Sequence, residues 1–197
     1  MNYLAHSFLS FSYDEILIGN FIADSLRGKE VESFHSSIKM GIQLHRLIDN
    51  FTDHHEIVKQ SKERLEPKYG KYDSVIMDIL YDHFLAINWN KYTDMTLTHH
   101  SEKVYQSLQN NYNILPPKIK EFLPHMIREN WLVQYGNEDG IAQSLRGMAR
   151  RASFVSHMEE AVVDLKNKYS EFDSDFQLFF PELISVCKNF LEQTQKA

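Results

Sequence analysis

Cysteine is almost absent from this chain of 197 residues, which contains only Cys187. A single cysteine excludes an intramolecular disulfide and a zinc site built on several cysteines, so any metal ligands must be histidine or carboxylate side chains. Glycine (7 residues) and proline (5 residues) are also scarce, and no alternating strand pattern is present. Apolar residues instead recur at steps of three and four, a spacing that predicts an all-α fold built as a multi-helix bundle.

The sequence also lacks a long apolar run and an excess of positive charge. No apolar stretch approaches the roughly 20 residues that span a bilayer, and residues 1–10 lack the basic start of a secretion signal. We therefore expect a cytoplasmic protein with no membrane contact. The formal net charge of −6 disfavours a nucleic-acid partner bound by broad phosphate neutralisation.

Apolar residues are abundant enough for one core. They make up 43% of the chain and include 13 Phe and 10 Tyr, which argues against disorder. We expect a single domain over residues 1–197.

Start and stop signals divide the chain into helices. Ser12 as an N-cap and Gly28 as a stop predict the first helix, and Pro181 is expected to interrupt or restart the last one. The predicted helices cover residues 13–27, 33–53, 56–65, 72–89, 101–111, 118–133, 141–152, 156–169 and 175–191.

The first predicted helix carries Asp24 although apolar residues wrap most of its circumference. A carboxylate on a buried helix is costly unless it is paired, hydrogen-bonded or bound to a cation. A salt bridge to Arg27 or Arg46 explains Asp24 as well as a metal role does.

Two later helices also place acid and imidazole groups among apolar residues. His45 and Asp49 are one turn apart, so both can reach one divalent ion, although such pairs are more often surface arrangements. Asp82 and His83 interrupt the apolar helix over residues 72–89 and can border one cavity. The alternative for this second pair is a buried hydrogen-bond network in which the carboxylate fixes the imidazole tautomer.

Three buried-looking helices that each donate acid or imidazole groups favour a shared cation, because clustered carboxylates otherwise repel one another. Mixed histidine and carboxylate ligands without sulfur suit an octahedral ion such as Mn²⁺ or Mg²⁺, or a non-haem Fe²⁺, and favour zinc less. The residues therefore predict a metal-dependent hydrolase site.

Several motifs of the chain are similar to those of a known family, the acyl carrier protein phosphodiesterases, also called acyl carrier protein hydrolases. This family is related to a distorted HD-domain phosphohydrolase fold. The matching segments are N-Y-L-A-H at residues 2–6, G-N-F-I-A-D-S-L-R-G at 19–28, G-I-Q-L-H-R-L-I-D-N-F-T-D at 41–53, D-H-F-L at 82–85, W-L-V-Q-Y at 131–135 and G-M-A-R-R at 147–151.

The resemblance implies an HD-domain-like fold and hydrolysis of the phosphodiester that joins 4′-phosphopantetheine to a serine of holo acyl carrier protein. The products are apo acyl carrier protein and free 4′-phosphopantetheine, and Mn²⁺ or Mg²⁺ is required. This activity fits the predicted metal site, since a metal ion can stabilise charge on a slowly hydrolysed phosphodiester.

We assign roles on these motifs as a hypothesis. Arg46 and Arg27 neutralise phosphate charge, His83 protonates the leaving serine oxygen, and Asp53 orients water or is only a surface acid. The residues that surround the metal are Asp24, His45, Asp49 and Asp82, with His6 as an additional ligand.

A protein partner that is strongly acidic, as acyl carrier proteins are, needs local positive charge on this negatively charged chain. Three arginines of one predicted helix, together with Arg27, can meet such a partner, or they are ordinary solvated charges. The three are Arg146, Arg150 and Arg151.

Two other functions stay open. One is an HD-type phosphohydrolase that acts on a nucleotide or signalling molecule with the same metal chemistry. The other is a non-catalytic helical binding module whose buried acids are structural, and metal analysis of the purified protein separates this module from both enzymes.

Overall fold

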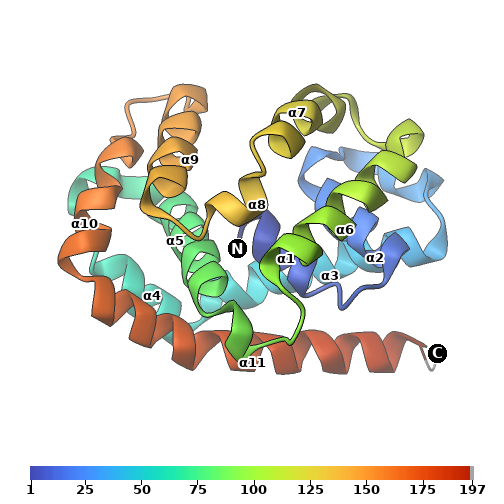
Figure 1. Cartoon of the computed structure of the whole chain (residues 1–197). Coiled ribbons are helices and arrows are strands. Elements are labelled where there is room, and N and C mark those ends of the chain that lie inside the picture. Colours follow the sequence, from blue (N-terminus) through green and yellow to red (C-terminus); the bar gives the residue numbers. More distant parts are fainter. Residues whose placement is uncertain (196–197) are drawn as a thin grey trace.

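The computed structural model describes residues 1–195, which contain helices and no strand, and this confirms the predicted all-α fold. No helix in that range is long and apolar enough to cross a membrane. Figure 1 shows the arrangement of α1 (Tyr3–Phe8), α2 (Asp14–Ile22), α3 (Ser36–His54), α4 (Glu56–Glu63), α5 (Asp73–Ile87), α6 (Leu97–Asn110), α7 (Pro117–Arg128), α8 (Trp131–Gln134), α9 (Glu138–Arg151), α10 (Ala161–Asn167) and α11 (Tyr169–Gln195). Short 3₁₀ turns connect them, namely η1 (Ala23–Ser25), η2 (Gly28–Ser33), η3 (Pro67–Tyr72), η4 (Trp89–Lys91), η5 (Tyr112–Ile114) and η6 (Met158–Glu160).

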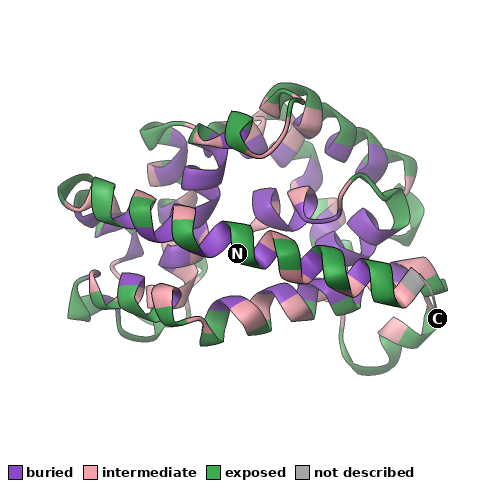
Figure 2. Ribbon diagram, turned by 90° about the horizontal axis from the view of Figure 1, so that it is seen from below, coloured by how far each residue is buried: buried purple, intermediate pink, exposed green. Residues whose placement is uncertain are grey.

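The long helix α11 runs along one side of the molecule and packs on α3, α4 and α5 (Figure 1). Its inner face buries Phe172, Phe176, Phe179 and Phe180 completely, whereas the outer residues are exposed (Figure 2). Each fully buried aromatic side chain contributes roughly 1.5–3 kcal/mol. The four phenylalanine rings therefore pack α11 against the helices that carry the acid and imidazole groups.

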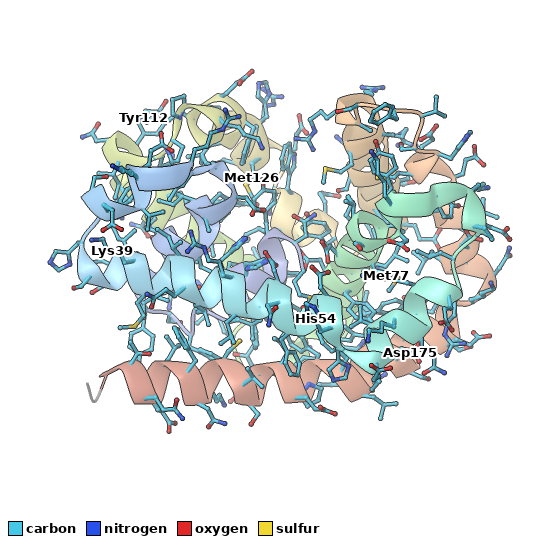
Figure 3. All side chains as sticks on the ribbon, turned by 180° about the vertical axis from the view of Figure 1, so that it is seen from behind. Lys39, His54, Met77, Tyr112, Met126 and Asp175 are labelled. Carbon is cyan, nitrogen blue, oxygen red and sulfur yellow. The ribbon has the colours of Figure 1, made fainter. Side chains whose placement is uncertain are left out.

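A buried carboxylate adds a polar contact between α11 and α4. Oδ2 of Asp175, a residue labelled in Figure 3, accepts hydrogen bonds from Nε of Arg64 and from Oγ of Ser61, both at 2.7 Å. The hydroxyl of Ser61 also lies 2.8 Å from the hydroxyl of Tyr81 on α5. These bonds satisfy an acid that would otherwise be costly to bury.

Two glycines let α2 and α3 approach very closely. A Cβ at Gly19 would lie 2.0 Å from the carbonyl oxygen of Ile38, and a Cβ at Gly41 would lie 2.2 Å from the carbonyl oxygen of Ile16. No larger residue fits at either position without moving a helix. Because Asn20 follows Gly19 and His45 lies one turn after Gly41, this contact brings the candidate site residues of the two helices together.

The N-terminal region departs most from the predicted helices. The predicted helix over residues 13–27 ends at Ile22, because the chain continues as the 3₁₀ turn η1. Leu26 then adopts an extended conformation and packs against the core. Ser12 is not the N-cap, since Tyr13 takes that position without a side-chain bond. The sequence patterns predict no helix before residue 13, whereas the structure has α1 there.

Three later boundaries also differ. The predicted helix over residues 118–133 is two helices, because Asn130 adopts a left-handed conformation with φ 48°. The segment over residues 156–169 contains η6 and α10 rather than one helix. The expected break at Pro181 is wrong: α11 continues through it, and since Pro181 is exposed, the carbonyl that loses its partner can bond to water.

Candidate functional site

Two stacked imidazoles and one carboxylate form the centre of the site. The rings of His6 on α1 and His45 on α3 stack with their centroids 4.1 Å apart. Asp49 bridges them, with Oδ1 3.2 Å from Nε2 of His6 and Oδ2 3.0 Å from Nε2 of His45. One potential ligand atom from each of the three residues lies within 4.8 Å of the others.

Asn20 on α2 sets the tautomer of both imidazoles. Its side-chain Nδ2 donates to the carbonyl oxygen of His6 and to Oγ of Ser10, so Oδ1 is the acceptor that faces Nδ1 of His6 at 2.7 Å. Its backbone carbonyl lies 2.8 Å from Nδ1 of His45. Both Nδ1 atoms therefore donate to Asn20, and both Nε2 atoms are directed at Asp49.

The two Nε2 atoms and the oxygens of Asp49 can all act as acceptors, so a proton or a metal cation must lie among them. Burial lowers the pKa of His6, whose Nε2 lies 3.2 Å from Oδ1 of Asp49. Burial also lowers the pKa of His45, but hydrogen bonds to Asp24 and Asp49 outweigh it and raise the pKa to about 9. Burial raises the pKa of Asp49, yet its bonds to both imidazoles hold the pKa well below its usual range. A divalent cation fits this set of nitrogen and oxygen donors.

Asp24 joins the centre from η1 and is exposed rather than buried as the sequence suggested. Its Oδ1 lies 3.0 Å from Nε2 of His45, while 80% of its side chain is accessible. The hydrogen bond from His45 lowers the pKa of Asp24. Asp24 therefore marks the side of the site that is open to solvent.

Asp82 on α5 is completely buried and bonds to the start of α1. Its carboxylate accepts backbone hydrogen bonds from Asn2, Leu4 and Ala5 at 3.3, 2.8 and 3.2 Å. Burial raises the pKa of Asp82 to about 7 against the lowering effect of these bonds. Within residues 1–195 the carboxylate forms no hydrogen bond to either imidazole and is not part of the His6, His45 and Asp49 cluster, so its predicted metal role stays a prediction.

The amino group of Met1 lies beside two carboxylates, Asp78 and Asp49. It is 2.7 Å from Oδ1 of Asp78 and 4.0 Å from Oδ1 of Asp49. Together with Asp82, these contacts fix the segment that precedes His6.

His83 points away from the centre. Its Nδ1 donates to the carbonyl oxygen of Tyr135 at 2.8 Å, so its Nε2 accepts from the hydroxyl of Tyr169 at 2.9 Å. The side chain is buried, and burial lowers its pKa. Both ring nitrogens hold structural partners, so the role of His83 as a proton donor stays a prediction that this geometry does not favour.

The remaining residues predicted to act in catalysis are exposed. Arg46 follows His45 on α3, and Arg27 lies in the extended link between η1 and η2, three residues after Asp24. Asp53 is one turn beyond Asp49, but its Oδ1 lies 3.7 Å from Nζ of Lys62 on α4. The structure therefore places Asp53 beside a largely buried lysine instead of beside the imidazoles.

The predicted partner-binding arginines of α9 are all exposed. Arg151 bonds within its own helix, to the carbonyl oxygen of Gly147 and to Sδ of Met148. Within residues 1–195, none of the three, Arg146, Arg150 and Arg151, forms a salt bridge to a carboxylate of the chain.

Asn20 is the site residue that the sequence analysis missed. It lies completely buried on α2. The signal was an amide side chain one residue after a glycine on an otherwise apolar helix, within the G-N-F-I-A-D motif. A buried amide needs partners, and here those partners are the two imidazoles.

Comparison with known proteins gives one consistent result. The family model described as "Acyl carrier protein phosphodiesterase" matches residues 1–183. Proteins of that name are similar to the chain: one from Photorhabdus laumondii is 32% identical over 96% of each chain. One from Enterobacter sp. (strain 638) is 30% identical and one from Escherichia coli O139:H28 is 31% identical, each over 96% of this chain and 98% of its own. No solved structure matches the chain, so the HD-domain relationship stays a prediction.

Proposed function

Because the chain belongs to the acyl carrier protein phosphodiesterase family, we propose that it removes the prosthetic group from holo acyl carrier protein. The reaction hydrolyses the phosphodiester between 4′-phosphopantetheine and the carrier serine, giving apo acyl carrier protein and 4′-phosphopantetheine. The support is a match that extends through nearly the whole of each relative, including the segments that carry His6, Asp24 and His45.

The proposed site is a divalent-cation site formed by His6, His45, Asp49 and Asp24, with Mn²⁺ as the preferred ion. The observation that carries it is the convergence of Nε2 of His6 and Nε2 of His45 on the carboxylate of Asp49, at 3.2 and 3.0 Å. One ligand atom from each of these three residues lies within 4.8 Å of the others, so one cation can bind all three. A bound divalent ion supplies Lewis-acid stabilisation of the charge that develops on the phosphoryl group.

In this proposal the protein's own residues orient the two imidazoles and neutralise the charge of the phosphate. Asn20 accepts from Nδ1 of both imidazoles and so directs both Nε2 atoms at Asp49, and Asp82 fixes the start of the helix that carries His6. In this proposal Arg27 and Arg46, which are exposed, neutralise the phosphate of an approaching diester.

The proposed partner surface is basic. Arg146, Arg150 and Arg151 give α9 an exposed positive side on a chain of net charge −6, which focuses attraction for an acidic carrier protein. Raising the ionic strength should therefore weaken capture of the carrier.

Intact-mass analysis tests the proposed function. Incubating holo acyl carrier protein with the purified chain and Mn²⁺ should reduce the carrier mass by that of the phosphopantetheine arm, and a chelator should prevent the loss. An unchanged carrier mass in the presence of Mn²⁺ would contradict the proposal. The Asp24→Ala variant serves as the matched inactive protein, because its side chain is exposed and its loss leaves the core intact.

A further inference from the structure

Two large apolar side chains stand side by side on the surface between α9 and η6. Phe154 is 67% exposed and Val155 is 83% exposed. Among the exposed large apolar residues in the described part of the chain, these two are the only consecutive pair. Single exposed apolar residues are ordinary, whereas an adjacent pair this open indicates a contact surface.

The loop that presents this pair is anchored at both ends. The backbone N–H of Phe154 donates to the hydroxyl of Tyr72 at 3.3 Å, and Nζ of Lys71 lies 4.2 Å from the centroid of the Phe154 ring. On the other side, Ser156 and Met158 are buried. Such a loop loses little conformational freedom on binding, so apolar contacts made there translate into affinity.

Positively charged residues lie near the pair. Lys71 contacts the ring of Phe154, and Arg150 and Arg151 precede Phe154 by four and three residues in the chain. All three are exposed, and none of them forms a salt bridge within residues 1–195. An apolar centre with a cationic rim is complementary to a protein surface that offers small apolar residues among carboxylates.

The loop follows α9, and α9 packs on α5. Asp82 of α5 in turn accepts the backbone N–H of Leu4 at the start of α1, the helix that carries His6. Figure 1 shows that the chain leaves α9 at the end that points away from α11. A docked protein covers roughly 800 Å² on each side, so its contacts at this end of α9 extend well beyond the two apolar residues.

We propose that Phe154 and Val155, with Lys71, Arg150 and Arg151 around them, form the docking surface for the acidic face of the carrier protein. This inference rests on the proposed function and identifies the part of the chain that selects the protein portion of the substrate. Phe154 and Val155 act as apolar anchors, and the arginines set orientation and the rate of encounter.

The test compares a protein substrate with a small one. For the double variant Phe154→Ser with Val155→Ser, the ratio of kcat/KM on holo carrier protein to kcat/KM on bis(4-nitrophenyl) phosphate should fall about tenfold or more, as expected when central apolar anchors are removed. The matched control is Val163→Ser with Leu178→Ser, which removes two apolar side chains that are 59% and 63% exposed on α10 and α11. The control should keep the wild-type ratio.

A binding titration separates the two proposals. The docking surface is wrong if the Phe154→Ser, Val155→Ser variant binds and processes the carrier as well as the wild type does. The proposed function alone is wrong if the carrier binds the wild-type chain, loses affinity in this variant and keeps its prosthetic arm in both. A wild-type chain that does not bind the carrier overturns both.

Discussion

Nδ1 of His6 donates a hydrogen bond of 2.7 Å to Oδ1 of Asn20, and this contact decides which nitrogen of His6 faces the centre of the site. The backbone of the same asparagine accepts from Nδ1 of His45 at 2.8 Å. One buried amide on α2 therefore orients two imidazoles that come from α1 and α3.

Replacing Asn20 with alanine should weaken Mn²⁺ binding by about 10–100-fold, the usual effect of losing a partner that orients a metal-ligating histidine. The backbone bond to His45 remains, so binding is reduced and not abolished. Calorimetric titration with Mn²⁺ measures the change, and Asn50→Ala, at an exposed position on α3, is the control. Wild-type affinity in Asn20→Ala would remove Asn20 from the site.

Substitution by alanine should impair activity at Asp24 and stability at Asp82. Asp24→Ala should lower kcat/KM by more than about 100-fold while changing the free energy of unfolding by less than about 0.5 kcal/mol, because the side chain is exposed. Asp82→Ala leaves three backbone N–H groups at the start of α1 without their acceptor, so it should destabilise the protein by about 3 kcal/mol or more. Chemical denaturation beside activity assays distinguishes them. An Asp82→Ala protein as stable as wild type would refute its structural role.

The stability of the metal-free protein should depend on His45 above neutral pH. The folded protein raises the pKa of His45 from 6.5 to about 9, so protonation favours folding. The contribution is complete below about pH 6.5 and disappears as the pH rises through about 9, and its size is on the order of 3 kcal/mol. Urea denaturation with a chelator from pH 6 to 10 measures it. In His45→Gln this part of the pH dependence should be missing.

To bind at the proposed site, Mn²⁺ would have to displace the same proton from Nε2 of His45, because that nitrogen cannot bind hydrogen and metal together. Apparent Mn²⁺ affinity should therefore increase with pH up to about 9, the pKa of the metal-free site. Proton release on binding, followed by calorimetry in buffers of different ionisation enthalpy, checks this independently of catalysis. Affinity that is flat between pH 6 and 9 would contradict the ligand role of His45.

Gly41 and Gly147 offer a matched pair of substitutions. A Cβ at Gly41 would lie 2.2 Å from the carbonyl oxygen of Ile16, so Gly41→Ala forces α2 from α3 and should destabilise the protein by about 1–3 kcal/mol. Gly147 lies in α9 with nothing within 4 Å of its would-be Cβ, so Gly147→Ala should stabilise it by up to about 1 kcal/mol. Thermal unfolding measures both changes. Equal effects in the two variants would disprove the close helix contact.

Part of the candidate site could be predicted from sequence because two of its residues, His45 and Asp49, lie close together in the chain. His45 and Asp49 are one turn apart on one helix, and this spacing alone places both groups on one face. Asp24 was assigned correctly to the neighbourhood of His45, at 3.0 Å, but its burial was wrong because the helix ends at Ile22 before reaching it.

The contributions of α1 and α2 could not be read from local patterns. A six-residue helix is too short to be stable alone, and α1 exists because Asp82, almost eighty positions away, accepts its first N–H groups. The carboxylate of Asp82, which the sequence analysis predicts as a metal ligand, accepts these backbone hydrogen bonds instead. Asn20 was missed for a similar reason, since its partners come from two other helices.

The bond from Asp82 to the start of α1 also has a consequence for biosynthesis. The carboxylate that accepts the first N–H groups of α1 is translated nearly eighty codons after them. In a nascent chain these N–H groups therefore lack their acceptor until α5 has been synthesised and has packed against α1. The position of His6 on α1 thus depends on a part of the chain that is made much later.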